Sequence, residues 1–421
     1  MVAAALLLSA CQSGRLIGGS VPLWSRASVG VAVVGPSLSP APPDFVSGWI
    51  PWWSGAAGRT AIENPALGGT IGDVSPFWHG IADDGSITLL GTQASLSAAV
   101  FAARSNGLTL IPSIADGTAA GVMSGILADP VSRTAHVNNI VTLVMSKGYD
   151  GIDIDYEVFA FSQRLIWAQI KPDWVAFVKE LSAELHARGK LLSVTVPPVW
   201  ITVTPTGVSL TRGYTVYAQD EIASSVDRLR LMVYDWSVSS PGPIAPMTWV
   251  TDVIAYSSSV VPASKLQLGV PAYGRHWVTK KNANETCPDA AIYKESVQMK
   301  NFDAVTAGHV VTRDPSGELK SAWTQVVTGP RTKPLPPPIV PPATVTIRTA
   351  NNPADGAPLL PAVRLTPPSS QVTCTVQHTV FVPDAYSVDQ RADAAHAAGW
   401  RGIILWAFGY ESSNLFDVLT V

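Results

Sequence analysis

The chain has 421 residues, with 28 Lys and Arg against 31 Asp and Glu and a formal net charge of -3. This near-neutral balance offers no basic stripe for a phosphate backbone, so we expect no nucleic-acid partner. Only 14% of the residues are charged, while 47% are hydrophobic and 14 are Trp, so the chain can bury a large core. No apolar run reaches the ~18 residues that a membrane-spanning helix needs, which argues against a polytopic membrane protein.

The N-terminus combines a short apolar run with a cysteine. Residues 2–8 are apolar, and the run ends in the sequence LSAC, whose last residue is Cys11. This tetrapeptide resembles a bacterial lipobox, in which the cysteine thiol receives a lipid. Under this interpretation residues 1–11 are a lipoprotein signal, the protein is exported to the cell surface or secreted, and it contacts the membrane only through the lipid on Cys11. The alternative is an ordinary signal remnant or a frayed N-terminus with an incidental cysteine.

Residues 12–44 are rich in Gly, Ser and Pro and predict a linker. From Phe45 onward, strand-like apolar runs alternate with helical patterns, which is typical of a parallel sheet covered by helices. Eight strands with helices between them predict a (β/α)8 TIM barrel, an α/β fold. The candidate strands are residues 45–52, 73–77, 108–114, 151–156, 191–196, 228–234, 266–272 and 402–408.

Three of the helices between the strands can be predicted from local sequence patterns. Residues 130–146 place apolar side chains on one face of a helix. We expect Pro172 to open the next helix, at a position that needs no N–H. Ser387 and Gln390 predict a capping box for the last helix, which Gly399 closes.

A long interruption separates the seventh and eighth candidate strands. We assign residues 45–274 to barrel strands one to seven, 275–378 to an insertion, and 379–421 to the completion of the barrel. Without the insertion and the leader, about 270 residues remain, close to the ~250 of a typical (β/α)8 barrel. Within the insertion, residues 330–342 contain seven prolines and predict an extended surface loop.

The chain has three cysteines. If Cys11 is set aside, Cys287 and Cys374 remain, and two thiols in an exported chain are most simply paired in one disulfide. The loop it closes spans roughly ninety residues, for which the chain-entropy model predicts ~4 to 5 kcal/mol. No HExxH or HxH spacing accompanies the cysteines, so we expect no metal site, and we expect no cofactor.

The most informative segment is residues 149–157, with the sequence YDGIDIDYE. In a strand, alternate residues share a face, so Asp153, Asp155 and Glu157 project to one side. A buried row of carboxyls is costly unless some are protonated or hydrogen-bonded, and the pKa values then split. This suits general acid catalysis, because a protonated Glu can donate to a leaving oxygen at neutral pH. The alternative is an exposed strand with a solvated acidic face, against which the interleaved Ile residues argue.

The pattern D-x-x-D-x-D-x-E over residues 150–157 resembles the signature of family 18 glycoside hydrolases, the chitinases and their relatives. It lies on the fourth candidate strand, where that family carries it. The segments LMVYDW, GVPAYG and GIILW resemble the family's sixth, seventh and eighth strands and stand at residues 231–236, 269–274 and 402–406. The resemblance covers about 45–421 and implies a TIM barrel with a small α+β insertion between strands seven and eight.

The resemblance implies roles for four catalytic residues. Glu157 would protonate the glycosidic oxygen and later activate water. Asp155 would hold the N-acetyl group of the substrate, whose carbonyl oxygen attacks the anomeric carbon to form an oxazolinium intermediate with retention of configuration. Asp153 would pair with Asp155 in the resting enzyme, and Tyr234 would hydrogen-bond the acetamido oxygen.

Further residues are expected at the substrate. Asp235 would contact the sugar, and Trp406 would form the apolar floor beneath it. Trp236, Tyr273 and Arg275 are candidates as well, although ordinary structural roles are the alternative for them.

Three tryptophans on the first candidate strand are also candidates for stacking on sugar faces. We select Trp52, with Trp49 and Trp53 as its neighbours, and expect that at least one of the three packs in the barrel.

Residues 234–249 and 268–274 are similar to the family branch of spore-cortex and cell-wall N-acetylglucosaminidases. We therefore expect a monomeric hydrolase whose partner is a GlcNAc-containing polysaccharide, the glycan strands of peptidoglycan. Hydrolysis of chitin or chito-oligosaccharides is the alternative. A second alternative is a sugar-binding lectin without activity, a class that typically loses the acidic Glu, whereas Glu157 is present.

Overall fold

The computed structural model describes residues 45–64, 71–331 and 371–419. The predicted lipobox with Cys11, the linker and nearly all of the proline-rich loop lie outside the described residues. Within the described ranges, no helix has the length and apolar character needed to cross a membrane.

The chain divides into two compact units. Among the described residues, the first comprises 45–64, 71–276, Ser296–Ser321 and 380–419, and the second comprises Trp277–Glu295, 322–331 and 371–379. Part of the segment between the seventh and eighth predicted strands, Ser296–Ser321, thus belongs to the first unit.

Eight parallel strands close into a barrel. β1 (Val46–Pro51) pairs with both β2 (Ile71–Ile81) and β17 (Gly402–Trp406), which closes the sheet. From β17 back to β2, the order continues through β11 (Leu266–Pro271), β10 (Arg228–Leu231), β7 (Leu191–Val196), β6 (Gly151–Asp155) and β5 (Ser113–Asp116). The predicted (β/α)8 barrel and its eight strands are confirmed.

Further strands pair with the barrel strands or with each other. β3 (Ile87–Leu89) and β4 (Thr109–Leu110) both pair with β2. β8 (Val199–Val203) and β9 (Ser209–Gly213) form an antiparallel hairpin after β7.

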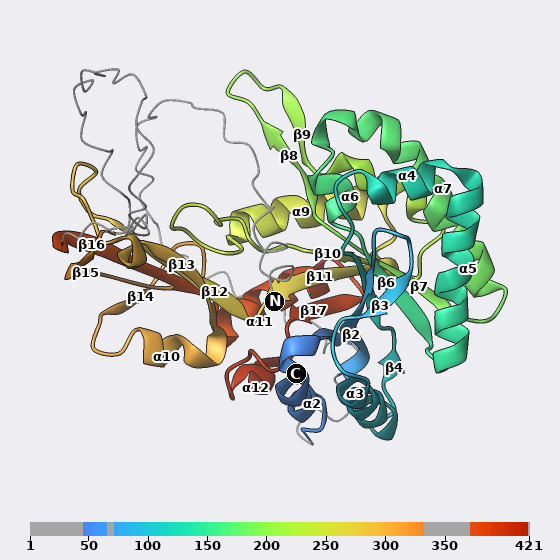
Figure 1. Ribbon diagram of the computed structural model, residues 1–421, viewed down its shortest axis with the longest axis horizontal. Coiled ribbons are helices and arrows are strands. Elements are labelled where there is room, and N and C mark those ends of the chain that lie inside the picture. Colours follow the sequence, from blue (N-terminus) through green and yellow to red (C-terminus); the bar gives the residue numbers. More distant parts are fainter. Residues whose placement is uncertain (1–44, 65–70, 332–370, 420–421) are drawn as a thin grey trace, which may run out of the picture. The chain divides into compact units, whose positions relative to one another are not determined.

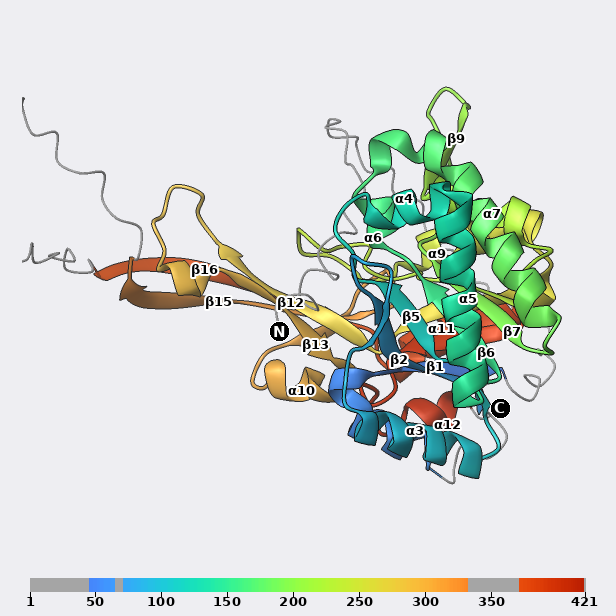
Figure 2. The same cartoon turned by 45° about the vertical axis from the view of Figure 1, so that its right-hand side comes forward.

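Helices cover the outside of the barrel, and Figures 1 and 2 show α5 (Pro130–Lys147) and α7 (Trp167–His186) side by side. As predicted, α5 covers the amphipathic segment. The predicted start of the next helix was wrong, because α7 begins five residues before Pro172. Ile170 is buried, so the packed face of α7 begins before Pro172.

α11 (Ala385–Ala397) starts differently from the prediction. The Asp384 side chain accepts the backbone N–H of Ser387 at 3.0 Å, so Asp384 is the N-cap and the predicted capping box at Ser387 and Gln390 was wrong. The Asp384 carboxylate, one turn earlier, accepts the backbone N–H that the Gln390 side chain would have accepted in the capping box.

The other α-helices are α2 (Gly55–Ile62), α3 (Gln93–Ser105), α4 (Val122–Ala128), α6 (Val158–Phe161), α8 (Gln219–Ile222), α9 (Met247–Val260), α10 (Phe302–Val305) and α12 (Leu415–Leu419).

The predicted α+β insertion between the seventh and eighth barrel strands is confirmed by a five-stranded sheet in the order β13-β12-β16-β15-β14. Its strands are β12 (Tyr273–Lys280), β13 (Tyr293–Gln298), β14 (Val311–Arg313), β15 (Leu319–Pro330) and β16 (Gln371–Val382).

The disulfide is confirmed as well. Cys287 and Cys374 are bonded across 87 residues of sequence, with their Cα atoms 5.1 Å apart. The pair is buried against Val278 and Val376. Within the second unit, the bond therefore joins two segments that lie far apart in the sequence.

Candidate active site

The predicted row of carboxyls stands at the carboxyl end of β6. Asp153 and Asp155 are buried within the strand, and Glu157 follows two residues later, immediately before α6. Because side chains alternate along the strand, Asp153 and Asp155 leave the same face, and Asp155 and Glu157 line the same pocket. This end of a (β/α)8 barrel is the end at which such barrels carry their active sites.

Asp153 is surrounded by hydrogen-bond donors from three strands. Its Oδ2 accepts from Trp49 Nε1 at 3.1 Å and from Ser113 Oγ at 2.7 Å. Its Oδ1 accepts from Ser193 Oγ at 2.7 Å and from Thr195 Oγ1 at 2.9 Å. Such donors stabilise an ionised carboxylate.

Asp155 has the opposite surroundings. Its side chain is buried, and its Oδ1 has no hydrogen-bond partner among the described residues. Burial, followed by the charges of Glu157, Asp153 and Asp116, raises the pKa of Asp155 well above the ordinary value. These surroundings favour the protonated form of Asp155 and leave its Oδ1 available to a ligand.

Glu157 is prepared to donate a proton. Burial raises the pKa of its carboxyl to about 8, and the negative charges of Asp116 and Asp235 contribute to the rise. A carboxyl with this pKa is largely protonated at pH 7, which is the state that general acid catalysis requires.

Asp116 was missed from the sequence. It is the last residue of β5, is fully buried, and accepts the backbone N–H groups of Val158 at 2.9 Å and Phe159 at 2.5 Å. It thereby fixes the backbone immediately after Glu157. Burial raises its own pKa to about 7. A terminal acid on the apolar third strand was the available signal, because barrel strands carry functional residues at that end.

Asp235 is held in place by two residues that were predicted to contact substrate. Its Oδ1 accepts from the Tyr273 hydroxyl at 2.6 Å and from Arg275 Nη2 at 2.7 Å. Asp235 also has a φ of 60°, a left-handed conformation that is uncommon outside glycine. Tyr273 and Arg275 do not line the pocket described below but support Asp235, which does.

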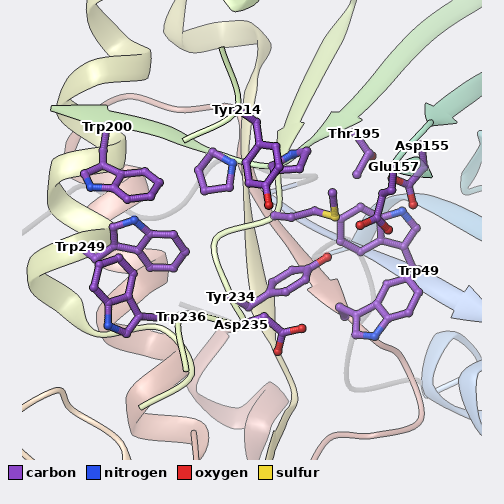
Figure 3. A pocket seen from close by; sticks show the side chains of 14 residues that line it. Trp49, Asp155, Glu157, Thr195, Trp200, Tyr214, Tyr234, Asp235, Trp236 and Trp249 are labelled. Atoms are coloured by element: carbon purple, nitrogen blue, oxygen red, sulfur yellow. The ribbon is translucent and has the colours of Figure 1, made fainter. Parts of the chain in front are cut away.

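A pocket joins these residues, and Figure 3 shows its two ends. Asp155, Glu157 and Trp49 lie at one end, three tryptophans lie at the other, and Tyr234 points between them. The lining residues are Trp49, Asp155, Glu157, Thr195, Pro197, Pro198, Trp200, Tyr214, Met232, Tyr234, Asp235, Trp236, Trp249 and Trp406.

Aromatic rings line the end of the pocket next to Asp155 and Glu157. Trp406 lines the pocket, with its ring centroid 5.7 Å from that of Trp49 and 5.3 Å from that of Phe77. Trp52 does not line the pocket, and its ring instead meets that of Trp53 edge-on at 5.5 Å. Trp49 therefore occupies the place that the sequence analysis gave to Trp52.

The far end of the pocket is a cluster of three tryptophans. The ring centroid of Trp236 lies 5.0 Å from that of Trp249 and 5.9 Å from that of Trp200. Only Trp236 was predicted. Trp200 comes from the β8–β9 hairpin and Trp249 from α9, and no local pattern in either segment indicates a shared site.

The described ranges contain no group of three or more His, Cys, Asp or Glu side chains that could hold a metal ion.

Comparisons with known proteins agree with this site. Residues 77–411 match the family model described as "Glycosyl hydrolases family 18". The chain is 31% identical over 211 residues to the "Putative sporulation-specific glycosylase YdhD" of Bacillus subtilis, which covers 49% of this chain and 46% of that protein. The chain spans about half or less of the length of the curated relatives it matches.

Solved structures share the fold. A chitinase from Chromobacterium violaceum superimposes with a TM-score of 0.64 at 21% identity, over 89% of this chain and 98% of that one. The spore cortex-lytic enzyme SleL of Bacillus megaterium gives 0.63 at 16% identity, over 91% and 74%. The family match spans most of the chain and includes the row of carboxyls on β6, so this protein belongs to the family 18 glycosyl hydrolases.

Proposed function

We propose that the protein is a retaining hydrolase that cleaves β-1,4 bonds after N-acetylglucosamine, with the substrate's own acetamido group as the nucleophile. The observation that carries this proposal is the pairing of Glu157, whose pKa is raised to about 8, with the buried Asp155, whose Oδ1 has no partner among the described residues. One carboxyl that can donate a proton, next to a carboxyl oxygen that can accept a hydrogen bond from the substrate, suits a substrate that supplies its own nucleophile.

Glu157 would act first as an acid and then as a base. Its proton passes to the glycosidic oxygen as the bond to the anomeric carbon breaks, and the leaving sugar departs as an alcohol. The resulting carboxylate then takes a proton from the water that attacks the anomeric carbon. The raised pKa keeps the proton available at neutral pH for the first step.

Asp155 and Tyr234 would position the acetamido group. The acetamido carbonyl oxygen attacks the anomeric carbon and forms a cyclic oxazolinium ion, which water reopens with overall retention. Asp155 Oδ1 would accept the acetamido N–H, and the Tyr234 hydroxyl would donate to the acetamido oxygen. The rings of Trp406 and Trp49 would support the apolar face of the sugar.

We assign peptidoglycan glycan strands as the substrate. The names of two similar proteins, a sporulation-specific glycosylase and a spore cortex-lytic enzyme, support this choice. The similar chitinase fold supports chitin or chito-oligosaccharides as the alternative. A lectin that only binds sugar is the second alternative, and the protonated Glu157 argues against it.

We further propose that the protein is exported and acts as a monomer, attached to the membrane through a lipid on Cys11. The disulfide between Cys287 and Cys374 supports export, because such bonds persist in oxidising compartments.

The test is mass spectrometry of the products that the purified chain releases from peptidoglycan and, in parallel, from chitohexaose. Fragments with reducing GlcNAc ends from peptidoglycan support the proposal, whereas chito-oligosaccharides alone indicate a chitinase. Glu157→Gln should abolish both products and leave binding measurable. Glu184→Gln, an exposed substitution outside the pocket, is the matched control and should remain active. Binding without products from the unaltered chain would establish the lectin alternative.

A further inference from the structure

The interior of the barrel below the pocket holds a fully buried arginine. Arg230 projects from β10, and its guanidinium is inaccessible to solvent. It contacts Asp73 Oδ1 at 2.5 Å, Ser75 Oγ at 2.6 Å, Gln267 Oε1 at 3.0 Å and Asp153 Oδ2 at 3.2 Å. One buried cation therefore reaches both the barrel interior and the first carboxyl of the row on β6.

The local charges balance only if Asp153 is ionised. Asp73 lies between two arginines, since Arg228 Nε contacts its Oδ2 at 2.8 Å. Burial would raise the pKa of Asp73, but Arg230 and Arg228 outweigh it and lower the pKa. One carboxylate cannot neutralise two buried guanidinium groups, and an uncompensated buried charge is costly. Asp153 is the second acidic group in contact with Arg230.

Hydrogen-bond geometry leads to the same result. Two of the groups facing Asp153 Oδ2 are N–H donors, on Trp49 and Arg230, and neither can accept a proton. Asp155 Oδ1, in contrast, has neither a donor nor a cation among the described residues. A proton shared by the two acids is therefore more stable on Asp155.

We propose that Arg230 is a positioning residue for catalysis: it holds Asp153 as a carboxylate and so fixes the proton of the Asp153 and Asp155 pair on Asp155. Arg230 does not itself line the pocket, although its guanidinium lies 5.9 Å from the ring centroid of Trp49, which does, and it contacts the row of carboxyls through Asp153. The role of this proton in catalysis rests on the proposed function, whereas its location on Asp155 does not. The other titratable or charged groups around this pair are Asp73 on β2, Asp116 on β5, Glu157 after β6, Arg228 on β10 and Arg401, whose charge also acts on Asp73 and Arg228.

The chain offers a matched pair of double variants. Arg230→Met with Asp73→Asn removes the cation that contacts Asp153 together with its other partner. Arg228→Met with Asp73→Asn removes the same charges but retains Arg230. Both arginines lie on β10 and both contact Asp73, so the two variants differ in which arginine remains beside Asp153. Thermal melting followed by circular dichroism compares their stability.

The measurement is carbon NMR of the full chain carrying aspartate labelled at the side-chain carboxyl, assigned with Asp153→Asn and Asp155→Asn. In the unaltered protein at pH 7 we expect the Asp153 resonance at the carboxylate position and the Asp155 resonance at the protonated position. In the Arg230 variant the Asp153 resonance should shift toward the protonated position, while the Arg228 variant should match the unaltered protein. This readout needs no enzymatic activity, so it separates failure of the inference from failure of the proposed function.

The pH profile of kcat/KM provides a second readout. Loss of a neighbouring cation disfavours the charged carboxylate, so the acidic limb should move upward by ~1 to 3 pH units in the Arg230 variant. It should remain in place in the Arg228 variant. A protonated Asp153 in the unaltered protein, or equal shifts in both double variants, would overturn the inference, and the first of these results does not depend on whether either double variant folds.

Discussion

The carboxylate of Asp116 accepts the backbone N–H of Val158 at 2.9 Å, directly after Glu157. This contact fixes a negative group beside the proposed acid. Burial and then the charge of Asp116 raise the pKa of Glu157 to about 8. The acid is thus tuned by a residue that lies on the neighbouring strand, 41 positions earlier in the numbering.

The first prediction concerns the unaltered protein. Because Glu157 must carry a proton to act as an acid, kcat/KM should fall as the pH rises through about 8, the pKa of Glu157 in the free protein. Initial rates across pH 5 to about 10 on a soluble oligosaccharide will define this alkaline limb. An activity that remains constant to the alkaline end of this range would show that Glu157 is not the acid.

Replacement of Asp116 by Asn should move that limb. Loss of the negative charge makes ionisation of Glu157 easier, so the alkaline limb should shift to lower pH by about one unit. The amide also keeps only one acceptor oxygen for two backbone N–H groups, which should destabilise the fold by about 1 to 3 kcal/mol. The pH profile and urea denaturation measure the two effects separately. If the variant loses stability but its alkaline limb stays at the same pH, Asp116 has only a structural role.

A buried glutamate anchors the loop that carries part of the pocket. Glu318 accepts the backbone N–H groups of Ile244 at 2.8 Å and Ala245 at 2.7 Å, and it pairs with Arg391 at 3.1 Å. Ile244 in turn accepts the backbone N–H of Trp236, which lines the pocket.

Glu318→Gln should therefore loosen this loop. One backbone N–H loses its acceptor and Arg391 loses its charged partner, at a cost of about 3 to 5 kcal/mol. We expect KM to rise more than kcat falls, because Glu318 contacts none of the carboxyls on β6. Steady-state kinetics well below the melting temperature test this, with the exposed Glu184→Gln as control. An unchanged KM in a destabilised variant would show that the anchor does not affect binding.

The difference between what the sequence predicted and what it missed has a physical origin. The barrel strands are buried on both faces and appear as apolar runs, and the row from Asp153 to Glu157 follows from alternation along one strand. Both are local patterns. Trp200 and Trp249 meet only after the β8–β9 hairpin and α9 have packed, so their contact has no local signal.

Long-range packing also explains the errors. Pro172 was predicted to start the helix, but α7 begins at Trp167 and buries Ile170, which precedes the proline. Trp49 lies on β1, whereas that strand ends at Pro51 and Trp52 begins a turn of 3-10 helix, and of the two only Trp49 lines the pocket. For Arg275 the sequence left substrate contact and a structural role open, and its ion pair with Asp235 could not be read from residue type alone.

The tryptophan cluster at the far end of the pocket should bind sugars beyond the one held at Asp155. Trp236→Ala removes a ring that is 41% exposed, so the fold should tolerate the change. Loss of one stacking ring is worth about 0.5 to 1.5 kcal/mol, which corresponds to a rise of about 2- to 10-fold in KM. The effect should appear on long oligosaccharides that reach the cluster and be absent on a short substrate.

Trp52→Ala provides the matched control, because it deletes the same side chain from a residue that does not line the pocket. Its KM on long oligosaccharides should equal that of the unaltered chain, whatever its effect on stability. Isothermal titration of inactive Glu157→Gln backgrounds separates binding from turnover. If Trp236→Ala and Trp52→Ala weaken binding equally, the loss comes from a general loosening of the barrel end. If only Trp236→Ala does so, the ring itself contacts the glycan.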